Sequence, residues 1–260
     1  AAAELFGNYS GQYKMILNIP LGITSSIGIA LIPAVTSLVA LGKRREAREK
    51  IDSIIKLTNL VAIPSCVGLI VLAEPIMNLL FVINNNVPIR LLQLGAITVI
   101  TYSFSTVTIA ILQGMGKMKT PVINAVISLA IHIVVVYILL QFTDMNIYSL
   151  VYGNLVFSFG MCALNLLSMY RYIGYTQEVF HSFALPGFAA VIMGAVAFFI
   201  YRAVYYIVHM NLIAIIFAVV VGVLTYGIVL ILIGGMSEDE LRSMPKGHLL
   251  VAFCRKIHIL

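Results

Sequence analysis

Leu212–Ile233 reads LIAIIFAVVVGVLTYGIVLILI and contains no charged side chain. A helix needs about 20 mostly apolar residues to cross a membrane, because hydrocarbon offers no partner to an unpaired backbone amide. The stretch therefore predicts a membrane-spanning helix. The rest of the chain has a similar composition, since 61% of its 260 residues are hydrophobic and only 10% are charged. A soluble domain carries about 25% charged residues, so the chain is predicted to fold in lipid.

Six other stretches of similar length and composition precede this one. They are Met15–Leu41, Ser53–Val82, Ile89–Gln113, Pro121–Leu140, Ile147–Tyr170 and Phe183–Val208. Strands of a membrane β-barrel would be near ten residues long and would alternate between apolar and polar residues, which none of these stretches does. The predicted fold is therefore all-α and integral to the membrane, with about seven transmembrane helices.

The distribution of Lys and Arg predicts the orientation of the chain. Only three of the 16 lie on one side of the predicted spans, namely Lys14, Arg90 and Arg202. The others lie in alternate loops or in the tail. Because cytoplasmic loops retain positive charge, residues 1–14 are expected as an extracellular loop, 15–233 as the helix bundle and 234–260 as a cytoplasmic tail. The tail segment 249–253 predicts an interfacial helix, and the basic loop 42–52 a short charged helix on the inner face.

The charged and sulfur-containing side chains predict no catalytic or metal site. All ten acidic residues lie in loops, in the tail or near the ends of spans. A proton or sodium relay would need a carboxylate at mid-membrane, and a membrane hydrolase would need an acid–base pair. Cys66, Cys162 and Cys254 form no Cys-x-x-Cys pair, and no cluster has metal-ligand spacing. No cofactor is predicted. The net charge of +6 is explained by the positive charge of the cytoplasmic loops, so a nucleic-acid partner is not predicted.

Neutral polar residues recur at helical spacing inside the spans. Asn124, Ser128 and His132, for example, lie at i, i+4 and i+8, on one face of a helix. The candidates for a substrate cavity are Asn18, Ser25, Thr101, Ser105, Asn124, Ser128, His132, Asn154, Ser158 and Asn165. One interpretation is a hydrated cavity, in which cysteines at positions 124, 132 and 154 would react with water-borne thiol reagents. The alternative is hydrogen bonding between helices, worth about 1 kcal/mol per bond.

Two prolines lie inside the first span, Pro20 and Pro33, with Gly22, Ser26 and Gly28 between them. Proline inside a helix frees a backbone carbonyl and bends the helix. Kinked helices rich in small residues are found where transporters bend, so the two prolines are predicted to form a hinge. Close packing through the small residues is the alternative.

Several stretches of the sequence resemble those of a known protein family. The stretch Leu21–Thr36, followed by the basic loop, by Ala62–Ser65 and by Leu72–Pro75, resembles the polysaccharide-transporter branch of the multidrug/oligosaccharidyl-lipid/polysaccharide (MOP) exporter superfamily. Ile111–Pro121 looks like a recurring turn of that branch, and Asp239–Gly247 is similar to its C-terminal end. Within the branch, the stage V sporulation protein B-like and lipid II flippase-like groups are the most similar.

The resemblance implies a MATE-like flippase fold of about fourteen helices in two lobes, with alternating access. This chain would be most of the C-terminal lobe, and its expected partners are the bilayer and a missing N-terminal lobe. The implied substrate is an undecaprenyl-pyrophosphate-linked oligosaccharide or lipid II, flipped across the bacterial cytoplasmic membrane. No Arg or Lys lies in the middle of a span, so no pyrophosphate-binding residue is transferred from the family.

Three other functions stay open at this point. A multidrug exporter of the same superfamily is expected to have intramembrane carboxylates in one lobe. A membrane glycosyltransferase or acyltransferase needs Asp or His motifs in loops, and the loops here are short and lack them. A non-catalytic scaffold for cell-wall assembly would use the polar stripes only for packing.

Overall fold

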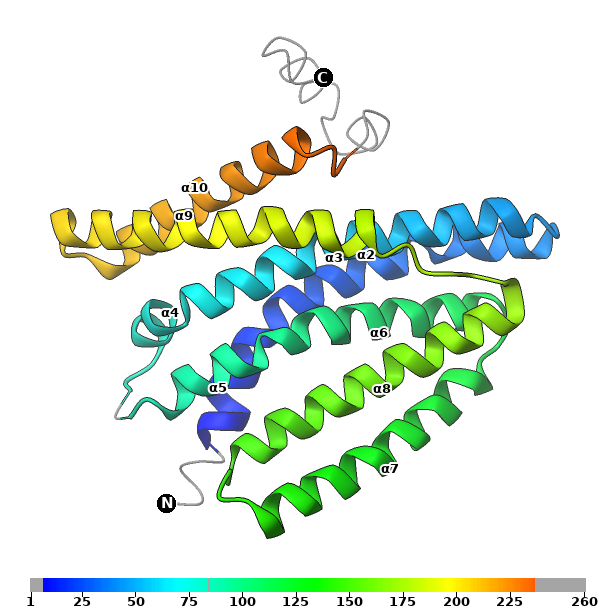
Figure 1. The fold of residues 1–260 in the computed structure, drawn as a ribbon, viewed down its shortest axis with the longest axis horizontal. Helices are drawn as coiled ribbons and strands as arrows, with labels where there is room; N and C mark the ends of the chain where they lie inside the picture. Colours follow the sequence, from blue (N-terminus) through cyan, green and yellow to red (C-terminus); the bar gives the residue numbers. More distant parts are fainter. Residues whose placement is uncertain (1–6, 84, 237–260) are drawn as a thin grey trace.

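The computed structural model describes residues 7–83 and 85–236, and throughout this part the regular structure is helical (Figure 1). Seven helices in the described part are long and apolar enough to span a membrane. The all-α membrane fold predicted from the sequence is thereby confirmed, and the chain is a multi-pass membrane protein.

The spanning helices follow the predicted stretches closely. They are α2 (Lys14–Ala40), α3 (Arg44–Val71), α6 (Ile97–Gly114), α7 (Lys119–Phe142), α8 (Tyr148–Ile173), α9 (Leu185–Val208) and α10 (Asn211–Leu232). Shorter elements accompany them: η1 (Asn8–Tyr13), α4 (Ala73–Leu80), α5 (Val87–Gly95) and η2 (Phe180–Ala184). The two η elements are π-helical and lead directly into α2 and α9.

Three helices form the centre of the bundle, with a helix pair on either side (Figure 1). α2, α3 and α6 pack against one another. The pair α9–α10 lies on α3, while α8 lies on α6 and carries α7 on its outer side. α7 is consequently the most peripheral of these spans. Of its most apolar 18-residue stretch 11% is buried, against 56% for α6.

Two of the predicted spans are interrupted. The stretch predicted as Ser53–Val82 breaks at Leu72, where α3 ends and α4 begins. The stretch predicted as Ile89–Gln113 breaks at Ala96, between α5 and α6. The ring of Tyr13 packs directly onto Gly95, where a Cβ would overlap it. Glycine at the end of α5 thus admits a buried aromatic ring at the break.

The N-terminal segment differs from the expected loop over residues 1–14. From Gly7 onward it is helical and continues into α2. Tyr9 and Tyr13 are both buried, and they pack in a core with Leu91 and Leu92 of α5. The hydroxyl groups of these tyrosines make the segment look polar in the sequence. Their rings nevertheless have the apolar area to stabilise a core.

The basic loop 42–52 is likewise not a separate helix. Only a turn at residues 41–43 separates α2 from α3, and α3 begins at Arg44. The segment from Arg44 to Asp52 contains good helix formers and no breaker, so the charged residues form the first turns of the spanning helix. Glu46 pairs with Lys43 and Glu49 with Arg45, at 3.0 Å in each case.

The connections near most of the Lys and Arg residues lie at one end of the bundle. The α2–α3 turn, the α6–α7 turn and the end of α8, which contains Arg171, are found together on the right of Figure 1. Arg48 of α3 donates a hydrogen bond to the carbonyl of Gly174 after α8 (3.3 Å). Gly116 closes the α6–α7 turn with φ +76°, a conformation that favours glycine. Of the predicted tail, the structure describes only residues 234–236, so its predicted interfacial helix lies outside the described residues.

Candidate functional site

A chain of buried hydrogen bonds joins three of the spanning helices. Asn124 of α7 donates through Nδ2 to Oδ1 of Asn165 on α8 (2.8 Å) and to Oγ of Ser168 (3.2 Å). Asn165 in turn donates to Oγ1 of Thr108 on α6 (3.0 Å). Asn124, Asn165 and Thr108 are all buried. Side-chain amides in such positions hold helices together, because leaving them unpaired in an apolar interior is costly.

A second bond ties α6 to α8 further along the same faces. The hydroxyls of Thr101 and Ser158 lie 2.7 Å apart, and both residues are buried. Ser105, on the same face of α6, is also buried, and its carbonyl accepts a hydrogen bond from Thr108 (2.9 Å). The stripe on α6 therefore faces α8.

Two polar residues of α7 pack against glycines of α8. A Cβ at Gly160 would lie 3.0 Å from Oγ of Ser128, and a Cβ at Gly153 would lie 2.9 Å from Cε1 of His132. The Oγ of Ser128 and the Nδ1 of His132 are buried without a hydrogen-bond partner among the described residues. The His132 ring also meets Phe157 edge-on, at 6.2 Å between centroids. These contacts are close, as at helix crossings through small residues.

A polar pocket of about 320 Å³ lies where α2, α6 and α8 meet. It is lined by Tyr13, Lys14, Leu17, Asn18, Leu21, Thr98, Tyr102 and Asn154. Asn18 is exposed and Asn154 is half-buried, so both amides are accessible to a ligand. Lys14 adds a positive charge, and Tyr102 adds a phenol. The pocket can therefore bind a ligand that is rich in oxygen atoms.

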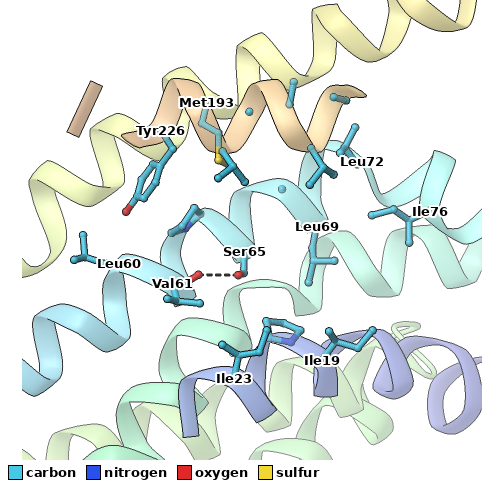
Figure 2. A pocket seen from close by; sticks show the side chains of 18 residues that line it. Ile19, Ile23, Leu60, Val61, Ser65, Leu69, Leu72, Ile76, Met193 and Tyr226 are labelled. Carbon is cyan, nitrogen blue, oxygen red and sulfur yellow. Dashed lines mark hydrogen bonds between the residues drawn. The ribbon is translucent and has the colours of Figure 1, made fainter. Parts of the chain in front are cut away.

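An apolar pocket of about 450 Å³ lies between α2, α3, α4, α9 and α10 (Figure 2). Figure 2 shows Ile19 and Ile23 of α2 facing Leu69 of α3 across it, with Met193 on the far side. The hydroxyl of Ser65 donates to the carbonyl of Val61 (2.7 Å), so this donor is already used within α3. The pocket suits a hydrocarbon chain.

The helix α2 separates the two pockets. Leu17, Asn18 and Leu21 line the polar pocket, while Ile19, Pro20 and Ile23 line the apolar one. At 100° per residue these two sets lie on opposite faces of the helix. A single spanning helix thus presents polar groups to one side and hydrocarbon to the other.

The structure reduces the number of candidate residues that can line the predicted cavity. Six of the ten candidates are buried between helices and line neither pocket: Thr101, Ser105, Asn124, Ser128, Ser158 and Asn165. For them the alternative interpretation, contact between helices, describes the observed geometry. His132 and Ser25 are half-buried and also line neither pocket. Asn18 and Asn154 are the two candidates brought together in one pocket.

The two prolines of the predicted hinge have different environments. α2 stays helical through both of them. Pro20 is buried against the apolar pocket, whereas Pro33 is exposed. Between them Thr24 donates to the carbonyl of Pro20 (3.1 Å) and lies 2.7 Å from Oγ of Ser103 on α6. The segment between the prolines is therefore tied to α6.

The sequence alone does not identify several residues of the polar pocket. Lys14 has the sequence signature of a charge in a loop, and Tyr13, Thr98 and Tyr102 are not among the predicted cavity residues. Asn18 and Lys14 are four positions apart, which places them on one face of α2; this spacing was the available signal. Thr24 and Ser103 were missed because a contact between two distant helices has no local pattern.

At the basic end, a phenol and a carboxylate connect the segment after α8 to α3. Tyr175 is buried and donates to Oδ1 of Asp52 (2.7 Å). Burial and the hydrogen bond to Asp52 raise the pKa of Tyr175 well above its usual range, so its hydroxyl remains a donor at neutral pH. Glu178 accepts a hydrogen bond from the backbone N–H of His181 (3.1 Å). Although desolvation opposes the change, its contacts with His181 lower the pKa of Glu178.

The described residues contain no group of three His, Cys, Asp or Glu side chains placed to hold a metal ion. Around the polar pocket the structure offers amides, phenols, a hydroxyl and one ammonium group. These groups can bind and orient a polar ligand by hydrogen bonds and charge.

The MatE family model matches residues 13–138, which include α2, α3, α6 and nearly all of α7. The chain is 28% identical over 133 residues to the probable lipid II flippase MurJ of Bdellovibrio bacteriovorus, covering 48% of this chain and 25% of that protein. It is 29% identical over 128 residues to the lipid II flippase MurJ of Bacillus subtilis, covering 46% and 23% respectively. These matches confirm the resemblance to the MOP superfamily, although the matched segment spans only about a quarter of each relative.

Proposed function

We propose that this chain forms part of the translocation pathway of a flippase for a polyprenyl-linked glycan. The observation that carries the proposal is the position of α2 between a polar pocket and an apolar pocket. A lipid-linked sugar has a polar headgroup joined to a long hydrocarbon chain. A helix with a polar face and an apolar face can separate the two parts while the molecule crosses the membrane.

The energetics of the two pockets fit this task. A polar headgroup loses several kcal/mol for each hydrogen bond left unmade in hydrocarbon. The amides of Asn18 and Asn154, the ammonium of Lys14 and the phenol of Tyr102 replace such bonds. The hydrocarbon chain needs only apolar contact, which the second pocket supplies. Such a protein makes and breaks no covalent bond.

The comparisons support a substrate of this class, because one relative is named a lipid II flippase and the other a probable lipid II flippase. We assign as substrate an undecaprenyl-pyrophosphate-linked oligosaccharide or lipid II. We place the protein in the bacterial cytoplasmic membrane with its basic end and its C-terminus in the cytoplasm, following the distribution of positive charge. In this proposal an N-terminal lobe completes the pathway, and Pro20 and Pro33 allow α2 to bend during alternating access.

The experiment is a flipping assay on the protein as the cell produces it, reconstituted in liposomes with fluorescent lipid II. Dithionite quenches only probe in the outer leaflet, so the rate of quenching reports flipping. Asn154→Ala should lower the rate about three- to tenfold, the factor for one hydrogen bond of roughly 1 kcal/mol. Asn211→Ala is the matched control, since this amide bonds to the carbonyl of Pro75 (2.9 Å) and lines neither pocket.

The apolar pocket has its own pair of variants. Gly68 lines the pocket, and a Cβ added to it would have no atom within 4 Å. Gly68→Phe should therefore fill the pocket and reduce flipping. Gly227 of α10 has equally open space and lines neither pocket, so Gly227→Phe should leave the rate unchanged. Normal flipping in Gly68→Phe and Asn154→Ala, or export of a cationic dye in place of lipid II, would overturn the proposal.

A further inference from the structure

The polar pocket is organised by a residue that does not line it. Tyr9 belongs to η1 and is 5% exposed. It nevertheless contacts three of the residues that form the pocket wall. Its ring stacks on Tyr13, with centroids 5.3 Å apart and an interplanar angle of 29°. The Nζ of Lys14 lies 4.8 Å from the centroid of the same ring.

The third contact holds an amide in place. Nδ2 of Asn154 donates a hydrogen bond to the phenolic oxygen of Tyr9. A side-chain amide has two N–H donors on one side and a carbonyl acceptor on the other. After a rotation of the amide by 180° the Tyr9 hydroxyl could donate to Oδ1 in turn, because a phenol both donates and accepts. Tyr9 therefore holds one polar end of the Asn154 amide in either orientation and leaves the other end available to a ligand.

The contact with Lys14 places a cation in the same pocket as this amide. An ammonium group over a tyrosine ring is attracted by the negative face of the π-system. The contact limits the motion of a long flexible side chain, whose ordering would otherwise oppose ligand binding. The ring of Tyr9 therefore fixes the ammonium, and its hydroxyl fixes the amide.

We infer that Tyr9 is a positioning residue for the headgroup, and this inference rests on the proposed function. It holds the amide of Asn154 and the ammonium of Lys14 in place within one pocket. The pair fits a ligand in which a hydroxyl lies close to an anionic oxygen, such as a sugar that bears a phosphate or a carboxylate. A neutral, purely apolar amphiphile would gain nothing from this arrangement.

The test is a double-mutant cycle between Tyr9→Phe and Asn154→Ala, measured by flipping of fluorescent lipid II in liposomes. Tyr9→Phe keeps the ring that stacks on Tyr13 and supports Lys14, and it removes only the oxygen that holds Asn154. It should raise the probe concentration for half-maximal flipping about three- to tenfold and leave the maximal rate nearly unchanged. In the Asn154→Ala background the same change should have no further effect, because its target is gone.

Tyr201→Phe is the matched control. Tyr201 donates to Oδ1 of Asn211 (3.0 Å) on the other side of the bundle, so this variant also loses one phenol–amide bond but should retain normal half-saturation. An equal loss from Tyr9→Phe in both backgrounds would overturn the inference, because the phenol would then act independently of Asn154. An unchanged half-saturation concentration in Tyr9→Phe, together with reduced flipping in Asn154→Ala, would also overturn it. Normal flipping in Asn154→Ala would instead count against the proposed function.

Discussion

Asn124 on α7 and Asn165 on α8 are joined by a hydrogen bond of 2.8 Å, and both side chains are buried. In the sequence these two amides are equally good candidates for the lining of a wet cavity. In the structure Asn165 also donates to Thr108 of α6, so its amide uses a donor and an acceptor within the bundle. The pair therefore stabilises the packing of three helices, whereas Asn18 and Asn154 keep polar atoms available in a pocket.

Replacing Asn165 with alanine should destabilise the protein. The change leaves Nδ2 of Asn124 without Oδ1 and removes the donor to Thr108, so we expect a loss of about 1–2 kcal/mol in unfolding free energy. Thermal unfolding in detergent measures this loss. Asn154→Ala, at a half-buried position, should unfold near the wild-type temperature. An Asn165→Ala protein of normal stability that no longer flips lipid would instead point to a role in the cavity.

The packing of α7 on α8 should depend on Gly153. In Gly153→Ala the new Cβ would overlap Val136 and lie 2.9 Å from Cε1 of His132, so the helices must separate or His132 must move. Overpacking of this kind costs about 1–3 kcal/mol. Gly227→Ala introduces the same methyl group where nothing lies within 4 Å and should be neutral or slightly stabilising. Equal melting temperatures for the two variants would contradict the close contact.

The bond between Tyr175 and Asp52 should make stability sensitive to alkaline pH. The pKa of Tyr175 is raised by burial and by Asp52, whereas in the unfolded chain it is about 10. Its contribution is thus fully present below pH 10 and is lost as pH rises above that value. Tyr175→Phe should be less stable at neutral pH and should lose less stability between pH 8 and pH 11 than the wild type does. Parallel losses in both proteins would show that this phenol does not carry the effect.

The fold could be predicted because lipid imposes one rule along the whole chain. Each span had to satisfy its backbone hydrogen bonds internally over about 20 residues, and this requirement is readable from composition. The break at Ala96 was not predicted, since the sequence does not show that Tyr13 packs onto Gly95. The helical structure over residues 7–13 was not predicted, because Tyr9 and Tyr13 belong to a core that forms only through contact with α5.

The candidate site was predictable only in part, for a geometric reason. Helical spacing shows which polar residues share a face, but not what that face meets. The stripes on α6, α7 and α8 meet one another, whereas Asn18 and Asn154 meet a pocket. A side chain in either environment has the same sequence signature. The distinction depends on how neighbouring helices cross, which is a property of the whole bundle.

The most direct test of the account is the accessibility of single cysteines to a membrane-impermeant thiol reagent. In a protein whose Cys66, Cys162 and Cys254 are replaced by alanine, we would compare Asn18→Cys and Asn154→Cys with Asn124→Cys and Asn165→Cys. If Asn18 and Asn154 line a pocket while Asn124 and Asn165 lie between helices, labelling should be rapid at positions 18 and 154 and slow at 124 and 165. Slow labelling at 18 and 154, or labelling at 124 and 165 as fast as at 154, would rule out this assignment.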